Sequence, residues 1–300
     1  CFIYLIYLMK KITIISNQAF SLINFRGKFL EFLYNNNYKI HCLAPDFTEE
    51  IKKELIEIGC IPIDYKLNRS SVNPITEFLH FFLLFFKIKK INPDIIFSYS
   101  IKPVIYASII SYFVKTPKCF SLIEGLGYIF TDRNTNKYSF KNFYNKIIKF
   151  IVIQMYKLSL PFNKKVFFLN TSDINEFQSR RLVSVEQTEL IDGIGLDLKY
   201  FSYQPATPKD KIVFLYLGRL LREKGLYEFI EAAIKIRKVT SQASFLVVGD
   251  IDTNPGSINE REVKQWVKEG LIDWIRFTRD VRPYLQKSSV FVLPSYYREG

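Results

Sequence analysis

The segment from Gly218 to Gly225 places two cations where a chain ordinarily avoids them. Gly218 follows an apolar run, and Arg219 and Lys224 come just before a stretch with helical spacing. The first turn of a helix has unpaired N–H groups and the positive end of the dipole, so Asp or Glu would stabilise it better. A bound anion such as a diphosphate would resolve this conflict. The plainer alternative is that these cations are solvated turn residues and bind no anion.

The surrounding sequence reads as one strand–helix–strand unit. The runs Ile212–Leu217 and Phe245–Val248 are continuously apolar, as strands buried on both faces of a parallel sheet must be. Between them an apolar residue recurs every three or four positions, which predicts a helix with one apolar face. Gly218 has no side chain, so a ligand can approach the backbone where the first strand ends. The unit can therefore hold an anion at that end.

The eight residues from Gly218 to Gly225, GRLLREKG, resemble the G-R-L-x-x-E-K-G motif of the retaining glycosyltransferases of family 4. In that family the arginine and the lysine bind the diphosphate of a nucleotide-sugar donor. The resemblance implies this role for Arg219 and Lys224. The stretch that ends the chain resembles the start of a second family motif, Glu, seven residues, Glu. It makes Glu299 the carboxylate that contacts the sugar hydroxyls, and all three residues catalytic.

Both ends of the chain lead to expectations about its length. The second motif stops one residue after Glu299, and its second Glu binds the nucleotide ribose in the family. We expect an inactive, C-terminally truncated piece whose reading frame continues for on the order of 60–80 residues, or roughly two βα units. Cys1–Leu8 is too short to span a bilayer. Because Met9 follows it directly, we expect residues 1–8 to be upstream sequence.

The first part of the chain alternates apolar strands with helical segments, which indicates an α/β, doubly wound parallel sheet. The expected strands are Ile12–Ile15, Tyr38–Leu43, Ile61–Tyr65, Ile95–Tyr99, Cys119–Ile123 and Val166–Leu169, with helices including Phe20–Tyr34, Thr48–Ile58, Pro74–Ile91 and Val104–Phe113. Glycines and prolines between 193 and 208 indicate a linker. The resemblance then implies a GT-B fold: two Rossmann-like domains facing a cleft, with residues 9–204 binding the acceptor and an incomplete domain, residues 205–300, binding the donor.

Several polar segments fall at the predicted strand ends of the first domain. A Gly-Leu-Gly-Tyr loop at 125–128 lets a ligand approach the backbone at Gly125 and Gly127, and Tyr128 offers a face for sugar stacking. The alternative is that Gly125 and Gly127 only allow the chain to turn and contact no ligand. This region resembles a bacterial subgroup of family 4 that elongates lipid-linked oligosaccharides, which makes Lys102 and Glu124 acceptor-site candidates.

Arg26 opens the first helix near the same edge and could meet an acceptor phosphate, although a surface arginine fits equally well. The sequence departs from the family in two places. Many members have a His after the fourth strand and a Gly-Gly pair after the first. This chain has Ser98-Tyr99-Ser100 and Ser16-Asn17-Gln18, so neither role transfers.

Composition excludes several other functions. The net charge is +13 among 300 residues, yet the lysines are scattered and no short nucleic-acid signature is present. The four cysteines are isolated, which argues for reduced thiols in the cytoplasm, and the two histidines lie in apolar surroundings. Asp250-Ile251-Asp252 matches a metal-binding D-x-D pattern by chance. We expect no metal, no cofactor and no nucleic acid.

Two apolar stretches are candidates for membrane contact. Phe78–Ile91 is too short to span and is expected to fill the space between helix and sheet. Tyr138–Leu160 interleaves lysines with aromatic residues, which suits a helix lying on an anionic membrane. An ordinary amphipathic helix packed on the sheet is the alternative.

The resemblance implies a retaining transferase that moves a hexose or N-acetylhexosamine from a UDP-sugar to an undecaprenyl-diphosphate-linked glycan. It would work on the inner face of the cytoplasmic membrane, in surface polysaccharide or oligosaccharide synthesis. The rival interpretations are a nucleotide-sugar epimerase of the same fold and an inactive membrane-associated fragment. A dinucleotide-dependent dehydrogenase has little support because no G-x-G-x-x-G follows the first strand.

Overall fold

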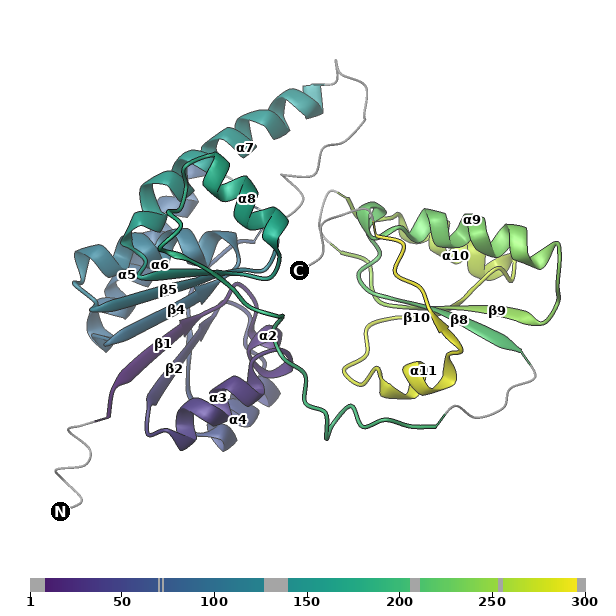
Figure 1. Ribbon diagram of the computed structural model, residues 1–300, viewed down its shortest axis with the longest axis horizontal. Coiled ribbons are helices and arrows are strands. Elements are labelled where there is room, and N and C mark those ends of the chain that lie inside the picture. Colours follow the sequence, from purple (N-terminus) through teal and green to yellow (C-terminus); the bar gives the residue numbers. More distant parts are fainter. Residues whose placement is uncertain are drawn as a thin grey trace. The chain divides into compact units, whose positions relative to one another are not determined.

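The protein consists of two compact α/β units, which divide between Gly195 and Leu196 (Figure 1). The computed structural model describes residues 9–69, 71, 73–126, 140–205, 211–252 and 256–295, with the backbone alone for 140–145. The sequence placed the boundary near residue 205. The segment that follows Gly195 therefore groups with the second unit.

The first unit is a seven-stranded parallel sheet of order β3-β2-β1-β4-β5-β6-β7. Its elements are β1 Lys11–Ile15, α2 Ala19–Asn24, α3 Gly27–Asn35, β2 Lys39–Ala44, α4 Glu49–Ile58, β3 Ile61–Asp64, α5 Pro74–Ile91, β4 Ile95–Tyr99, α6 Ile101–Phe113, β5 Lys118–Ile123, α7 Phe140–Ser159, a 3₁₀ turn Leu160–Phe162, β6 Lys165–Phe168, α8 Thr171–Ser179 and β7 Thr188–Leu190. The strand order reverses beside β1, between β2 and β4. A ligand crevice in such a sheet lies at the carboxyl ends of the strands near that point.

The second unit is a four-stranded parallel sheet of order β10-β9-β8-β11. Its elements are β8 Ile212–Leu217, a 3₁₀ turn Arg222–Lys224, α9 Leu226–Arg237, β9 Ala243–Val248, α10 Glu260–Lys268, β10 Asp273–Ile275, α11 Arg282–Lys287 and β11 Val290–Phe291. The strand pairs β8–β9, β9–β10 and β8–β11 all run parallel. The loops after β8, β9 and β11 therefore leave the same edge of the sheet.

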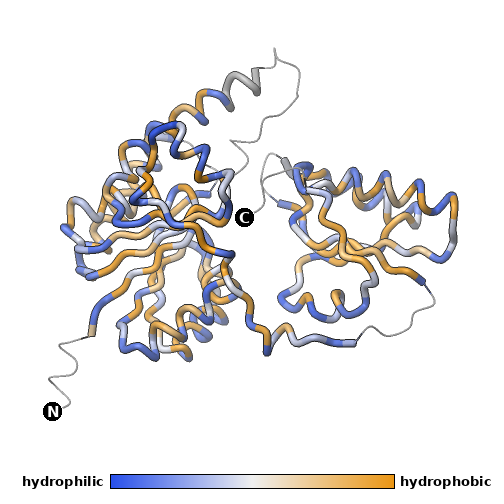
Figure 2. The backbone as a smooth tube through the Cα atoms, viewed as in Figure 1, coloured by the Kyte–Doolittle hydropathy of each residue, from blue (hydrophilic) through white to orange (hydrophobic). Residues whose placement is uncertain are grey.

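Each sheet is covered by helices on both faces. In the first unit, α2, α3 and α4 pack on one face around Leu22, Leu30 and Leu55, whereas α5 to α8 pack on the other around Ile110 and Phe177. In the second unit, α9 and α10 cover one face and α11 the other. Figure 2 shows the apolar character of β8 and β9. This double cover explains why the strands have unbroken apolar sequences instead of alternating ones.

The structure confirms the predicted strands and most helices, and it corrects one helix. The expected helix Phe20–Tyr34 is two helices, α2 and α3, separated at Phe25 and Arg26. The φ of Arg26 is −124°, outside helical geometry, and its side chain is buried. Periodicity did not show this break, because the apolar spacing continues through it. Arg26 therefore precedes the second helix and does not open the first.

Sequence reasoning also missed the seventh strand and the surface of α5. β7 has three residues, too few for a periodic signal, and it pairs with β6. α5 begins and ends where predicted, with Asn73 capping its N-terminus. Its expected role was wrong, however, because only Leu84 and Ile88 are fully buried while most of its phenylalanines face solvent.

His41 and three of the cysteines predicted to be inert are buried in the first unit, whereas His80 is only partly buried. His41 lies on β2 among apolar neighbours, and desolvation, with Lys39 and Lys11 nearby, lowers its pKa to about 4. The imidazole is therefore neutral at physiological pH. Cys42, Cys60 and Cys119 are buried free thiols. None of the helices in the described ranges has the length and apolar character needed to cross a membrane.

Replacing Gly249 by alanine should destabilise the second unit. Gly249 has φ +148°, and a Cβ there would overlap the carbonyl oxygen of Gly218. Strained backbone alone costs about 1–3 kcal/mol. Both tryptophans, Trp266 and Trp274, belong to this unit, and the Trp274 indole N–H donates to the Gly249 carbonyl at 2.9 Å. Tryptophan fluorescence during urea unfolding therefore measures the loss.

The matched control is Gly218→Ala. A Cβ at Gly218 would have no neighbour closer than the Tyr216 hydroxyl oxygen at 4.0 Å, and the backbone there is unstrained. We expect its unfolding midpoint to stay within a few tenths molar urea of the parent. Equal midpoints for Gly249→Ala and Gly218→Ala would contradict the packing argument.

Candidate functional site

The loop from Gly218 to Gly225 crosses the carboxyl end of β8, where the sequence predicted an anion site. A 3₁₀ turn, Arg222–Lys224, separates Gly218 from α9, which begins at Leu226, where the helical spacing of the sequence also begins. The N–H groups of Gly218, Leu220 and Arg222 already donate to backbone carbonyls. The sequence argument that this backbone is free for a ligand is therefore wrong for most of the loop.

The start of α9 remains suited to an anion. Its N-cap is Gly225, with φ +78°, and within the described residues no side chain caps the helix. Gly225 is required there, because a Cβ would overlap the carbonyl oxygen of Pro294. The first turn of an uncapped helix has N–H groups that a phosphate can accept from. The N–H donors thus lie at Leu226 and beyond, at the start of the helix that the sequence predicted.

Arg219 is held in place by an acidic residue from the neighbouring loop. Its guanidinium NH1 lies 2.9 Å from Oδ2 of Asp252, which follows β9 and is mostly buried, whereas the Arg219 side chain is half exposed. The Tyr216 hydroxyl also donates to the Arg219 carbonyl at 3.0 Å. Asp252 belongs to the D-x-D pattern that the sequence analysis set aside. It serves here as the partner of Arg219.

The remaining cations of the loop differ in exposure. Arg222 is exposed and lies over the ring of Tyr227, 5.2 Å from its centroid. Lys224 is partly buried, at the end of the 3₁₀ turn that leads into α9. Arg219, Arg222 and Lys224 thus concentrate positive charge on the chain between β8 and α9. An anion bound there would be attracted by all three.

The segment after β11 packs directly on this loop. The Pro294 carbonyl lies against Gly225, and the Ser295 hydroxyl donates to the Glu223 carbonyl at 3.2 Å. The two motifs identified in the sequence therefore meet at one edge of the second sheet. Glu299 itself lies outside the described residues, so its role stays a prediction.

In the first unit, two predicted residues that are far apart in sequence form an ion pair. NH2 of Arg26 donates to Oε1 of Glu124, which directly follows β5. Arg26 is only 4% exposed, and its guanidinium lies 4.7 Å from the centroid of the Tyr99 ring. The alternative of a surface arginine is therefore wrong. Burial raises the pKa of Glu124, and Arg26 opposes that shift.

A chain of hydroxyl groups supports this ion pair. Ser16 Oγ and Ser21 Oγ lie 2.8 Å apart, and Ser21 Oγ lies 2.9 Å from the Tyr99 hydroxyl. Burial raises the pKa of Tyr99 to about 12, so the phenol keeps its proton. The Tyr65 hydroxyl donates to the Ser16 carbonyl at 2.7 Å. The sequence listed Ser16 and Tyr99 as strand-end residues, and it gave no signal for Ser21 or Tyr65.

Lys102 does not join Arg26 and Glu124. Its Nζ donates to the carbonyls of Asn68 and Ser71, both at 2.6 Å, and to Oε1 of Glu77 at 2.8 Å. An ammonium group has three donors, and all are taken. Lys102 therefore fastens the loop before α5 to α6. Its proposed contact with an acceptor gains no support from this geometry.

Gly125 is the described part of the predicted glycine loop. Its φ of +135° is in the region that favours glycine, directly after Glu124. This backbone places Leu126 in the core of the first unit. Gly127 and Tyr128 lie outside the described residues, and their predicted contacts with an acceptor stay predictions.

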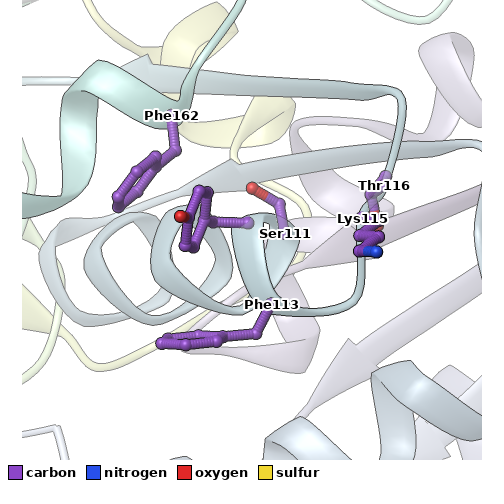
Figure 3. A pocket seen from close by; sticks show the side chains of 6 residues that line it. Ser111, Phe113, Lys115, Thr116 and Phe162 are labelled. Carbon is purple, nitrogen blue, oxygen red and sulfur yellow. The ribbon is translucent and has the colours of Figure 1, made fainter.

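A hollow of about 520 Å³ lies at the other edge of the first sheet (Figure 3). It is lined by Ser111, Tyr112, Phe113, Lys115, Thr116 and Phe162. Five of these residues end α6 or precede β5, and Phe162 ends the 3₁₀ turn before β6, so the hollow lies at the amino ends of the strands, away from Arg26 and Glu124. Tyr112 and Phe162 stack with centroids 4.6 Å apart. Among the described residues, no cluster of three or more His, Cys, Asp or Glu could hold a metal ion.

Two bacterial glycosyltransferases are similar in sequence to this chain over nearly its whole length. It is 27% identical to the Campylobacter jejuni N,N'-diacetylbacillosaminyl-diphospho-undecaprenol alpha-1,3-N-acetylgalactosaminyltransferase, covering 97% of this chain and 75% of that protein. It is 26% identical to the Staphylococcus aureus capsular polysaccharide biosynthesis glycosyltransferase CapM, covering 92% of this chain and 70% of that protein. The crystal structure of Anabaena HepE in complex with UDP and glucose superposes with a TM-score of 0.65 at 13% identity, covering 97% of this chain and 75% of that one.

Two family models match the two units. The model described as "Glycosyl transferases group 1" matches residues 211–300, and the model described as "Glycosyl transferase 4-like" matches residues 11–169, more than half of the chain. The α/β fold class inferred from the sequence, GT-B, is confirmed by these matches and by the solved structures that share the fold. The chain therefore belongs to the Glycosyl transferase 4-like family and is a glycosyltransferase.

Proposed function

We propose that the protein transfers a hexose or N-acetylhexosamine from a UDP-sugar to an undecaprenyl-diphosphate-linked glycan, with retention at the anomeric carbon. The observation that carries the donor half is the cationic loop between β8 and the uncapped start of α9. The Campylobacter jejuni relative is named for a lipid-linked acceptor, and the HepE structure contains UDP. The first name supports the proposed acceptor, and the second supports the proposed UDP-sugar donor.

In the donor half, the departing group is a nucleoside diphosphate, whose negative charge grows as the sugar leaves. Arg219 and Lys224 would each contact diphosphate oxygens, and the first N–H groups of α9 would donate hydrogen bonds to other oxygens of the diphosphate. Asp252 keeps the Arg219 guanidinium in one place before the donor binds. Such preorganisation stabilises the transition state without a cost in reorienting the arginine. This proposal needs no metal and no cofactor.

In the acceptor half, the Arg26–Glu124 pair would bind the glycan. Glu124 is 30% exposed, so its carboxylate can accept a hydrogen bond from an acceptor hydroxyl while Arg26 balances its charge. Gly127 and Tyr128 complete the proposed acceptor site, and Glu299 the proposed donor site, on the sequence argument alone. The bond from the acceptor hydroxyl oxygen to the anomeric carbon would form as the bond from that carbon to the diphosphate breaks, and the hydroxyl proton would pass to the departing diphosphate.

A lipid-linked acceptor suggests a protein that works on the inner face of the cytoplasmic membrane. The sequence assigned the membrane contact to α7. In the structure, Tyr156 and Leu160 at its end join the core of the first unit, while Phe150 and Leu158 are exposed. One face of α7 therefore packs on the sheet side, as the alternative to a membrane helix required, and the other face is exposed. The pathway would be the synthesis of surface polysaccharide or oligosaccharide.

Acceptor dependence distinguishes a transferase from the epimerase alternative. The full-length protein should release UDP from a UDP-sugar when membranes with lipid-linked glycan are present, and release little without them. A panel of UDP-hexoses and UDP-N-acetylhexosamines identifies the donor. Conversion of the UDP-sugar to its epimer without any acceptor would reject the proposal, as would the lack of transfer from every donor tested.

Arg219→Ala and Lys224→Ala should each lower kcat/KM for the donor by roughly 10- to 100-fold, because each deletes a charge-assisted contact to the diphosphate. Arg237→Ala is the matched control. Arg237 is an exposed cation at the far end of α9, where it favours the helix dipole and cannot reach the loop after β8. Parental kcat/KM in Arg219→Ala, or an equal loss in Arg237→Ala, would refute the diphosphate assignment.

Glu124→Gln should raise KM for the acceptor while KM for the UDP-sugar stays unchanged. The amide keeps the shape of the carboxylate but loses its charge and leaves Arg26 without an ionic partner. Protonation of Glu124 would remove the same charge. Because the pKa of Glu124 is raised, acceptor binding should weaken as the pH falls, and this weakening should begin at a higher pH than for an ordinary glutamate. A changed donor KM, or a parental acceptor KM, would remove Glu124 from the acceptor site.

A further inference from the structure

α5 exposes an apolar face that nothing in the described structure covers. It packs beside α6 on one face of the first sheet (Figure 1), and its inward residues Leu84 and Ile88 are fully buried. The outward residues are large and apolar: Ile75, Phe78, Leu79, Phe82, Leu83 and Phe86. A helix that is apolar on both sides is ordinarily surrounded by protein or lipid.

The outward residues form one continuous stripe. Phe78, Phe82 and Phe86 follow one another at four-residue steps, so they lie along the same side of the helix. Lys90 is four residues after Phe86, and Lys89 is seven after Phe82, so the stripe ends in two exposed lysines. At 1.5 Å per residue the helix is about 27 Å long. The stripe thus joins an aromatic surface to a basic end.

The charge on this face has a single sign. Apart from Pro74 at its start, every exposed side chain of α5 is either large and apolar or a lysine. The acidic residue of the helix, Glu77, is turned to α6, where its carboxylate accepts hydrogen bonds from Lys102 and the Tyr106 hydroxyl. Interfacial helices combine such an apolar side with lysines that meet lipid phosphates.

The position of α5 relates the stripe to the acceptor edge. The helix follows β3 and the loop that Lys102 fastens, so Ile75 and Phe78 lie at the carboxyl-end edge of the sheet. Arg26 and Glu124 lie at that same edge. The lysines, at the C-terminus of the helix, lie toward the amino ends of the strands. A bilayer against α5 would therefore extend from the acceptor edge along the side of the first unit.

We propose that the outward face of α5 docks on a bilayer that contains anionic phospholipid, with the phenylalanines in the boundary between headgroups and acyl chains. Lys89 and Lys90 contact the headgroup phosphates. The choice of lipid rests on the proposed function, since a lipid-linked acceptor brings the protein to a membrane. This surface is distinct from α7, which the sequence assigned to that role.

A second copy of the chain is the other candidate occupant, and charge disfavours it. Two copies would each bring a net charge of +13, and no exposed carboxylate on α5 would offset the lysines. Like charge across an interface opposes association, whereas it favours an anionic membrane. The arrangement is therefore complementary to lipid.

Vesicle sedimentation without donor or acceptor tests the surface directly. Phe78→Ser with Phe86→Ser should weaken binding to vesicles of phosphatidylglycerol and phosphatidylcholine by tenfold or more, since two aromatic side chains no longer leave water. Lys89→Gln with Lys90→Gln should weaken it roughly 30-fold, and should not affect binding to pure phosphatidylcholine. Circular dichroism and sedimentation velocity of each variant confirm that the fold and the oligomeric state are those of the parent.

Two matched double variants complete the design. Phe32→Ser with Ile56→Ser removes equally exposed apolar residues, both 61% exposed, from the opposite face of the sheet, and should leave vesicle binding unchanged. Phe150→Ser with Leu158→Ser does the same on α7. Loss of binding in the α7 pair but not in the α5 pair would overturn the inference. So would a parent dimer that the α5 pair dissociates.

The proposed function is tested separately, with an acceptor on a short, water-soluble lipid. The α5 variants should transfer sugar to it at parental rates, because no docking is needed. If the α5 variants bind vesicles as well as the parent does, and the parent transfers sugar to the soluble acceptor, the docking surface alone is refuted. Absence of transfer in the parent protein would refute the proposed function and leave the vesicle result standing.

Discussion

Backbone contacts that only glycine permits bring the loops of the second unit together. Gly249 lies against the Gly218 carbonyl, and Gly225 lies against the Pro294 carbonyl, so the loops after β8, β9 and β11 meet without intervening side chains. Because the strands are parallel, these loops leave the same edge of the sheet. Asp252 can therefore reach Arg219, and the segment that leads to Glu299 starts beside the cationic turn. The proposed donor site depends on this close packing.

The structure explains part of the unfavourable placement of Arg219 near the positive end of a helix dipole. Cations near a helix start are unfavourable by themselves, and the sequence alone indicated an external anion. The protein supplies part of the answer, because Asp252 pairs with Arg219, and α9 begins later than the arginine. Glu223, a buried carboxylate, lies in the same turn, so the three cations Arg219, Arg222 and Lys224 are set against two acidic residues, Asp252 and Glu223. One positive charge is left in excess, and an anion would complement it.

Local sequence predicted the features that local physics determines. The unbroken apolar strands, the end of α4 at Ile58, the start of α5 at Pro74 and the cationic turn all follow from short-range patterns. The sequence could not indicate that Arg26 would be buried on Tyr99, because its partner Glu124 is 98 residues away. Nor could the sequence indicate the hydrogen bonds of Lys102, since their acceptors come from α5 and the loop before it. Periodicity also cannot separate an apolar helix face that is buried from one that is exposed, as α5 shows.

The two sheet edges differ in how they hold charge, and the difference suits their proposed substrates. In the first unit a buried arginine is balanced by Glu124 and surrounded by hydroxyl groups that keep their protons. Such a neutral, hydrogen-bonding surface suits the hydroxyls of a sugar, which carry no charge. In the second unit the three cations exceed the two acidic residues beside them, Asp252 and Glu223, which leaves a net positive loop at a helix start. A diphosphate supplies the missing negative charge, and it leaves more readily when that charge is already stabilised.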